Sequence, residues 1–175
     1  AKKDIGTASH KLNALSIAKK WELYGRYTAK TDVSYTVKYL REGDNKVLAP
    51  EKVVTDQTFD TEVTEQAADV VGYTPDAPSK TMILDEYNKV LTFSYSANTY
   101  DYTVRHIKQL PDGSYDEANA EVETLSGKFE ALAAVTAKDY GEHYPTNDAG
   151  TKQNIKIEKG LTIDVKYDLD EHTLT

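Results

Sequence analysis

The stretch GYTPDAPSKTMILDEYNKVLTFSYS, residues 72–96, contains the pattern from which the fold is predicted. It opens with Gly-Tyr, passes through two prolines, and ends in a segment where Leu91, Phe93 and Tyr95 alternate with more polar residues. Such alternation is typical of a strand with one buried face. The stretch contains no Cys, no His and no cluster of catalytic residue types, so it predicts architecture and not chemistry.

Length and composition fit one domain or two small ones. The chain has 175 residues, and its hydrophobic content of 39% is too high for a disordered protein. Its net charge of −8 argues against binding to nucleic acids and against docking on anionic membranes. Since no segment approaches the roughly 20 apolar residues of a membrane span, we expect no membrane insertion.

Cysteine is absent, and this absence does not decide the compartment. Residues 1–11 lack the apolar centre of a signal peptide. The abrupt start of the sequence is what we expect of a piece excised from a longer protein.

An internal repeat organises most of the chain. The tripeptide YTV occurs at 35–37 and again at 102–104, and Tyr95 has a counterpart in Tyr167. The distance between matching residues grows along the chain, which indicates a second copy with insertions in its loops.

The sequence of each copy predicts two strands, a helix and two further strands, in the order β-β-α-β-β. The predicted helices are TEVTEQAADVVGY at 61–73 and EALAAVTAKDYGEHY at 130–144, because apolar residues such as Val63, Ala67 and Val70 recur at helical spacing. Glu62 or Glu65 would then lie in the first helical turn, where the helix dipole favours acidic residues. The predicted strands are 35–40, 51–56, 79–84 and 90–96 in the first copy and 102–107, 120–125, 154–158 and 161–167 in the second.

This order predicts an α+β, β-rich fold of tandem β-grasp-like (ubiquitin-like) modules in an elongated arrangement. The predicted divisions are an N-terminal helix-containing segment at 1–33, a first module at 34–97, a second module at 98–170, and the start of a further repeat at 171–175. The segment 1–33 is either part of a preceding module, with Trp21 in the place of Tyr73, or a separate cap.

The sequence also resembles a known family. Residues 72–96 resemble the close of a MucBP-type repeat of Gram-positive surface proteins. The second copy is similar in YTVRHIKQLPDGSYDEANAEVETLSG at 102–127 and in GLTIDVKYD at 160–168. The resemblance covers roughly residues 34–170. The pattern has departures: Glu142-His143 replaces Val71-Gly72, and Phe129 stands where a small residue is expected after a turn at Gly127.

The resemblance implies a secreted, cell-wall-anchored bacterial protein with a β-grasp-like fold. It implies adhesion to mucin or other host glycoproteins, or a stalk that holds another domain away from the wall next to neighbouring repeats of the same chain. Some relatives bind immunoglobulins, and an exposed sheet edge offers a way to recognise antibody. The family has no catalytic residues to transfer.

No constellation in the sequence predicts an enzyme, a cofactor or a catalytic metal. The four histidines are far apart, and the S-x-x-K match at 16–19 lacks the context of a hydrolase. The acidic loops at 44–46 and 112–117 leave calcium open as an alternative to ordinary turns. An intramolecular isopeptide brace also stays open, with these candidate lysines: Lys38, Lys89, Lys108 and Lys166.

Aromatic residues are the predicted ligand contacts. Aromatic faces stack on sugar rings and anchor protein interfaces, and the chain has 13 tyrosines. Because positions shared by both copies are expected to serve the core, the predicted ligand-binding residues are Trp21, Tyr24, Tyr100 and Tyr115. The expected function is non-enzymatic: adhesion to mucin or another glycoprotein, antibody recognition, or a purely structural spacer.

Overall fold

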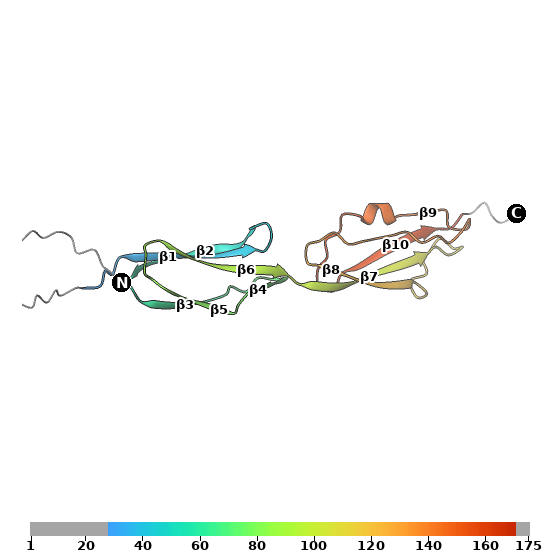
Figure 1. Cartoon of the computed structure of the whole chain (residues 1–175). Helices are drawn as coiled ribbons and strands as arrows, with labels where there is room; N and C mark the ends of the chain where they lie inside the picture. The colour runs from blue at the N-terminus through green and yellow to red at the C-terminus, as the bar shows by residue number, and fades with distance from the viewer. Residues whose placement is uncertain (1–27, 171–175) are drawn as a thin grey trace, which may run out of the picture.

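The computed structural model describes residues 28–170 of the chain (Figure 1). Within these residues the strands form two four-stranded sheets and one two-stranded sheet. In chain order the elements are β1 Val33–Arg41, β2 Val47–Gln57, β3 Glu62–Gln66, β4 Tyr73–Pro75, β5 Ser79–Ile83, β6 Lys89–Ala97, β7 Thr99–Lys108, β8 Glu121–Lys128, β9 Thr146–Asn147, the 3₁₀ helix η1 Ala149–Lys152 and β10 Thr162–Asp168.

The first four-stranded sheet is organised around β1 and has the order β2-β1-β6-β4. β1 pairs antiparallel with β2 and parallel with β6. Alternate residues of β1 are buried, namely Val33, Tyr35, Val37 and Tyr39. This alternation is the one that the sequence predicts for 35–40, and it places one face of the sheet toward the core.

The two-stranded sheet of β3 and β5 covers the buried face of this sheet. The strands pair antiparallel from Glu62↔Ile83 to Gln66↔Ser79. Val63 and Met82 pack against the core cluster that includes Phe93. Figure 1 shows β3 and β5 as a layer on one side of β1, β2 and β6. The four-stranded sheet and this two-stranded sheet together form what we call the N-terminal unit.

The second four-stranded sheet repeats the topology of the first. Its order is β8-β7-β10-β9, with β7 antiparallel to β8 and parallel to β10. Its core contains Tyr102, Val104, Ile163, Val165 and Tyr167. This sheet and the loops that cover it form what we call the C-terminal unit.

The predicted α+β, β-grasp-like fold is wrong, because residues 28–170 contain no α-helix. The segment 61–73, predicted as a helix, begins with strand β3 and then runs irregularly. Val63 is β-branched and favours a strand, where it faces the core. Ala67 and Val70 pack on the same core from the irregular segment, so apolar spacing that resembles a helix arises without one.

The second predicted helix, at 130–144, is also absent. Glu130 has a positive φ of 64°, which is incompatible with the start of an α-helix. The Ala133 backbone N–H donates to the Ile155 carbonyl at 2.8 Å, and Leu132 forms an isolated bridge with Lys156. Residues 131–133 of the segment therefore pair with residues 155–157, as β3 pairs with β5 in the N-terminal unit, and the rest of the segment runs irregularly.

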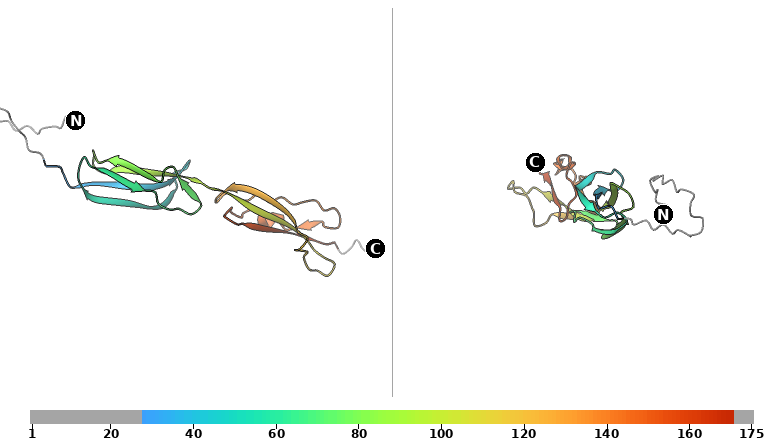
Figure 2. Two further views of the ribbon diagram at one scale, coloured as in Figure 1. Left: turned by 90° about the horizontal axis from the view of Figure 1, so that it is seen from below. Right: turned by 90° about the vertical axis from the view of Figure 1, so that its left-hand side faces the viewer.

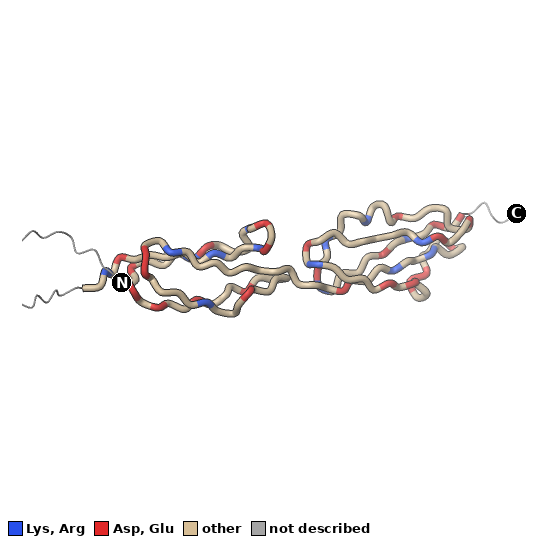
Figure 3. Tube along the Cα trace, in the orientation of Figure 1, with Lys and Arg blue, Asp and Glu red and all other residues tan. Residues whose placement is uncertain are grey.

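The two units lie end to end (Figure 2). β6 ends at Ala97 and β7 begins at Thr99, so Asn98 alone separates the last strand of one sheet from the central strand of the next. Lys and Arg are interspersed with Asp and Glu along both units (Figure 3).

Candidate binding site

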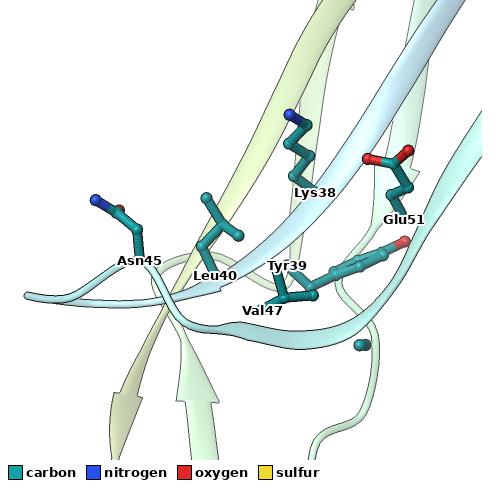
Figure 4. Close-up of a pocket in the computed structure, with 7 residues that line it drawn as sticks. Lys38, Tyr39, Leu40, Asn45, Val47 and Glu51 are labelled. Carbon is teal, nitrogen blue, oxygen red and sulfur yellow. The ribbon is translucent and has the colours of Figure 1, made fainter.

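A hollow of about 450 Å³ opens beside β1 and β2 in the N-terminal unit (Figure 4). The register between the two strands changes on both sides of Tyr39, which pairs with Ala49. Such irregularities bend a strand and redirect its side chains. The hollow is lined by Lys38, Tyr39, Leu40, Asn45, Val47, Ala49 and Glu51.

The hollow combines apolar walls with polar groups. Val47 is 66% exposed, whereas Tyr39 is buried and its ring stacks on Phe93 at 6.0 Å between centroids. Lys38 and Glu51 add one charge of each sign, and the positive φ of Asn45 shapes the turn beside it. Such a lining suits a small, partly polar ligand such as a sugar ring or a peptide side chain.

A second feature is the junction between the units, which centres on Phe129. This residue follows β8, yet its side chain packs against the core of the N-terminal unit. Its ring contacts Tyr73 and Tyr100 edge to face, at centroid distances of 5.6 and 6.0 Å. The ring also lies against Gly72, whose φ is +80°. Phe129 therefore joins the two units by aromatic packing.

Glu130 adds a polar clamp to the junction. Its Oε2 accepts a hydrogen bond from the Tyr73 hydroxyl at 3.0 Å. The same oxygen lies 3.4 Å from both Arg41 Nη1 and Lys46 Nζ on the N-terminal unit. The Tyr73 hydrogen bond and the nearby Lys46 charge outweigh burial and lower the pKa of Glu130 below its usual range. The carboxylate is therefore the favoured form in the folded protein.

Backbone hydrogen bonds hold the linking residue from both sides. The Asn98 N–H donates to the Gly72 carbonyl at 2.9 Å, and the Phe129 N–H donates to the Asn98 carbonyl at 2.8 Å. Lys128 Nζ also donates to the Ala97 carbonyl at 3.1 Å. These contacts restrict rotation at the only residue between β6 and β7.

The predicted ligand-binding residues do not gather at one place. Trp21 and Tyr24 lie outside the described residues. Tyr100 lies at the junction against Phe129. Tyr115 lies in the loop after β7, where its hydroxyl donates to Asp168 Oδ1 at 2.6 Å. Because Tyr100 lies near the start of β7 and Tyr115 bridges Gln109 just after its end, the two residues are on the order of 30 Å apart.

The acidic loops weighed for calcium are held by turn hydrogen bonds. Asp44 binds Arg41 with both carboxylate oxygens and accepts from the Lys46 N–H, which together lower its pKa. Asp112 accepts from the Ser114 N–H and hydroxyl. Between residues 28 and 170 no group of three or more His, Cys, Asp or Glu side chains is placed to hold a metal ion.

The lysines weighed for an isopeptide bond lie in different surroundings. Lys89 forms a surface ion pair with Asp85 at 2.5 Å. Lys108 Nζ lies 3.8 Å from the centre of the Tyr140 ring, and Lys166 Nζ lies 4.5 Å from that of Tyr115. Lys38 lines the hollow. These contacts are ordinary ion pairs and cation–π interactions.

Two features were missed by sequence reasoning. Glu65, assigned to a helical turn, is buried on β3 and accepts from the Tyr35 hydroxyl at 2.6 Å and from Lys52 Nζ at 2.8 Å. The hydrogen bonds from Lys52 and Tyr35 outweigh burial and lower the pKa of Glu65. The junction was missed as well, although Phe129 had already stood out as a departure from the repeat pattern.

Comparisons with known proteins find only distant similarity. No protein-family model matches the sequence, and no curated protein matches it. Among solved structures, a MucBP domain of a Lactobacillus acidophilus protein is 23% identical with a TM-score of 0.27, covering 38% of this chain and 90% of that one. Domains 3–4 of the Streptococcal High Identity Repeats in Tandem of a cell surface protein are 14% identical with a TM-score of 0.28, covering 79% and 98%.

The sequence resembles MucBP-type repeats, and one of the solved structures that match this chain is a MucBP domain. Both TM-scores are too low to support a functional argument, which therefore depends on the geometry of this chain. Across residues 28–170, no helix is long and apolar enough to cross a membrane.

Proposed function

We propose that this chain is a non-enzymatic repeat segment of a bacterial cell-surface adhesin, with modules 34–97 and 98–170 acting as a stalk. The observation that carries the proposal is the junction. Covalently linked domains usually move relative to one another. Here a single linking residue, the packed ring of Phe129 and the clamp on Glu130 all oppose such motion. A rigid, repeated unit suits a protein that holds a binding part away from the cell wall.

The stalk function is tested by measuring the distance between the two units. The chain has no Cys, so nitroxide labels can be attached at Val53→Cys on β2 and Val122→Cys on β8. Both positions are exposed, at 59% and 57%. We expect a narrow distance distribution, and we expect Phe129→Ser to broaden it. A broad distribution in the otherwise unaltered chain would contradict the stalk proposal.

Glycoprotein binding is a second candidate function, favoured by the hollow at β1 and β2. The ligand would be a sugar of mucin or of another host glycoprotein. The test is a glycan array and a mucin pull-down with the full chain and with Val47→Asp, which places a charge on the apolar wall. Val122→Asp on the other unit is the matched control. Absence of signal for every glycoprotein would leave the purely structural stalk.

Antibody recognition is a third candidate, favoured by the exposed edge of β8. This strand pairs with β7 without a register change from Glu121 to Lys128, whereas the edge strand β2 contains Pro50 and several register changes. A regular edge offers main-chain hydrogen bonds to an added strand. Surface plasmon resonance against separated Fab and Fc fragments tests this candidate, and no response to either would remove it.

A further inference from the structure

The N-terminal unit carries its own counterpart of the pair that docks the C-terminal unit. Phe59 and Asp60 follow β2 as Phe129 and Glu130 follow β8. Asp60 has a φ of 66° and Glu130 a φ of 64°, so the chain turns in the same way at both places. Phe59 is half-buried and Asp60 is exposed.

The backbone contacts around the two pairs also match. The Asp60 N–H donates to the Leu84 carbonyl at 2.8 Å, and the Leu84 N–H donates back to Thr61 at 2.8 Å. The C-terminal unit has the corresponding bonds. The Glu130 N–H donates to the Ile157 carbonyl at 2.9 Å, and the Ile157 N–H donates to the carbonyl of Ala131, which takes the place of Thr61, at 2.8 Å. The backbone around the pair therefore has the same hydrogen bonds in each unit, while the Phe59 ring also lies against Tyr87 of its own unit, at 6.4 Å between centroids.

The residues that lead into each unit are equivalent too. The Phe59 N–H donates to the Lys30 carbonyl at 2.7 Å, as the Phe129 N–H donates to the Asn98 carbonyl at 2.8 Å. In sequence, YTAKT at 27–31 precedes β1 as YSANT at 95–99 leads into β7. Lys30 thus corresponds to Asn98, the residue that links the two units.

We infer that this end of the N-terminal unit is a docking surface for another unit of the same kind, placed before it in the polypeptide. The residues corresponding to Gly72 and Tyr73 in that unit would contact Phe59, and those corresponding to Arg41 and Lys46 would pair with Asp60. The inference rests on the proposed stalk function, since it extends the observed junction to a second position.

The C-terminal unit does not repeat the glycine position against which the ring of Phe129 packs in the N-terminal unit. The Asp170 N–H donates to the His143 carbonyl as the Asn98 N–H donates to the Gly72 carbonyl, so His143 occupies the position of Gly72. A histidine side chain stands where the glycine leaves room for a phenylalanine ring. The docked unit must therefore resemble the N-terminal unit, and two copies of this chain are not expected to join head to tail through this contact.

A duplicated chain tests the inference. Residues 1–97 are joined directly to residues 30–175, so that the first copy of Gly72, Tyr73 and Arg41 precedes the second copy of Phe59 and Asp60. Nitroxide labels at Val53→Cys in both copies report the distance between the first two units. We expect a narrow distribution that Phe59→Ser in the second copy broadens.

A second variant guards against a folding defect, because Phe59 also packs on the core of its own unit. Asp60→Asn in the second copy removes the charge and keeps a residue that tolerates positive φ. It is expected to broaden the distribution at low salt while the circular dichroism spectrum stays unchanged. Phe59→Ser in the chain of 175 residues should leave the distance between Val53 and Val122 unaltered.

The outcomes separate this inference from the stalk proposal. A broad distribution in the duplicated chain, beside a narrow one across the natural junction, would overturn the docking surface and leave the stalk intact. A narrow distribution that neither variant changes would overturn the assignment of Phe59 and Asp60. A broad distribution across the natural junction would contradict the stalk itself.

Discussion

The ring of Phe129 occupies the space that a side chain at residue 72 would need. A Cβ atom on Gly72 would lie 2.2 Å from Cδ1 of Phe129, well inside the contact distance of two carbon atoms. Gly72 belongs to the N-terminal unit and Phe129 to the C-terminal unit. The contact between the units thus depends on the absence of a side chain at one residue and on the presence of a large one at the other.

Gly72→Ala is expected to destabilise the N-terminal unit more than Gly43→Ala does. Both glycines have positive φ, at +80° and +93°, but the space around Gly43 is open. The backbone term common to both substitutions is about 1 kcal/mol. The clash with Phe129 should add roughly 1–3 kcal/mol at residue 72. Urea denaturation of both variants measures the difference, and equal losses would show that the ring moves aside freely.

The double variant Gly72→Ala/Phe129→Ala separates the clash from the backbone term. Since removal of the ring relieves the contact, the two losses should be less than additive. A double-mutant cycle in urea measures this coupling. Strict additivity would mean that the two residues do not interact in solution.

Phe129→Ala alone should loosen the junction. Truncation of a fully buried Phe to Ala lowers the free energy of unfolding by about 3–5 kcal/mol. Because the ring of Phe129 is half-buried, its truncation should lower it by about 1–3 kcal/mol. The thermal midpoint of the N-terminal unit should fall, because the ring packs on its core. Leu132→Ala is the control: its side chain is 58% exposed, and a change within about 0.5 kcal/mol is expected.

Acid should weaken the junction through Glu130. The pKa of this carboxyl is lowered in the folded protein from its ordinary value of 4.5. A lowered folded pKa means that the carboxylate stabilises the fold above pH 4.5, and that this contribution is lost as pH falls through the lower folded pKa. Glu130→Gln should therefore remove part of the pH dependence of the distance distribution below pH 4.5. An identical acid response in both proteins would exclude a role for this group.

Tyr35→Phe should destabilise the N-terminal unit by about 1–2 kcal/mol, because it removes a hydrogen bond to the buried carboxylate of Glu65. Burial, followed by the bond to Glu65, raises the pKa of Tyr35 to about 12. Its contribution is complete below the ordinary pKa of 10 and is lost as pH rises through 12. Urea denaturation at neutral and alkaline pH measures both effects. Ser34→Ala, at a more exposed hydrogen bond to Asn88, is the control and should change stability little.

The strands were predictable where alternation continues over several residues. Tyr35, Val37 and Tyr39 are buried on β1, and Ile163, Val165 and Tyr167 are buried on β10, as the sequence predicts. The helices were predicted wrongly because a short strand followed by an irregular segment can place Val63, Ala67 and Val70 on one core. Local spacing does not distinguish this arrangement from a helix, since the pairing partner in β5 is more than a dozen residues away.

The sequence by itself determined the repeat, the positions of the long strands and the acidic, cysteine-free composition. These properties follow from residue identity and from the period of two along a strand. The tertiary structure decided that β3 and an irregular segment stand in place of the first predicted helix, that β2 bends to open the hollow, and that Phe129 packs against Gly72. Each of these depends on contacts between residues distant in sequence, and a distant partner leaves no local pattern to read.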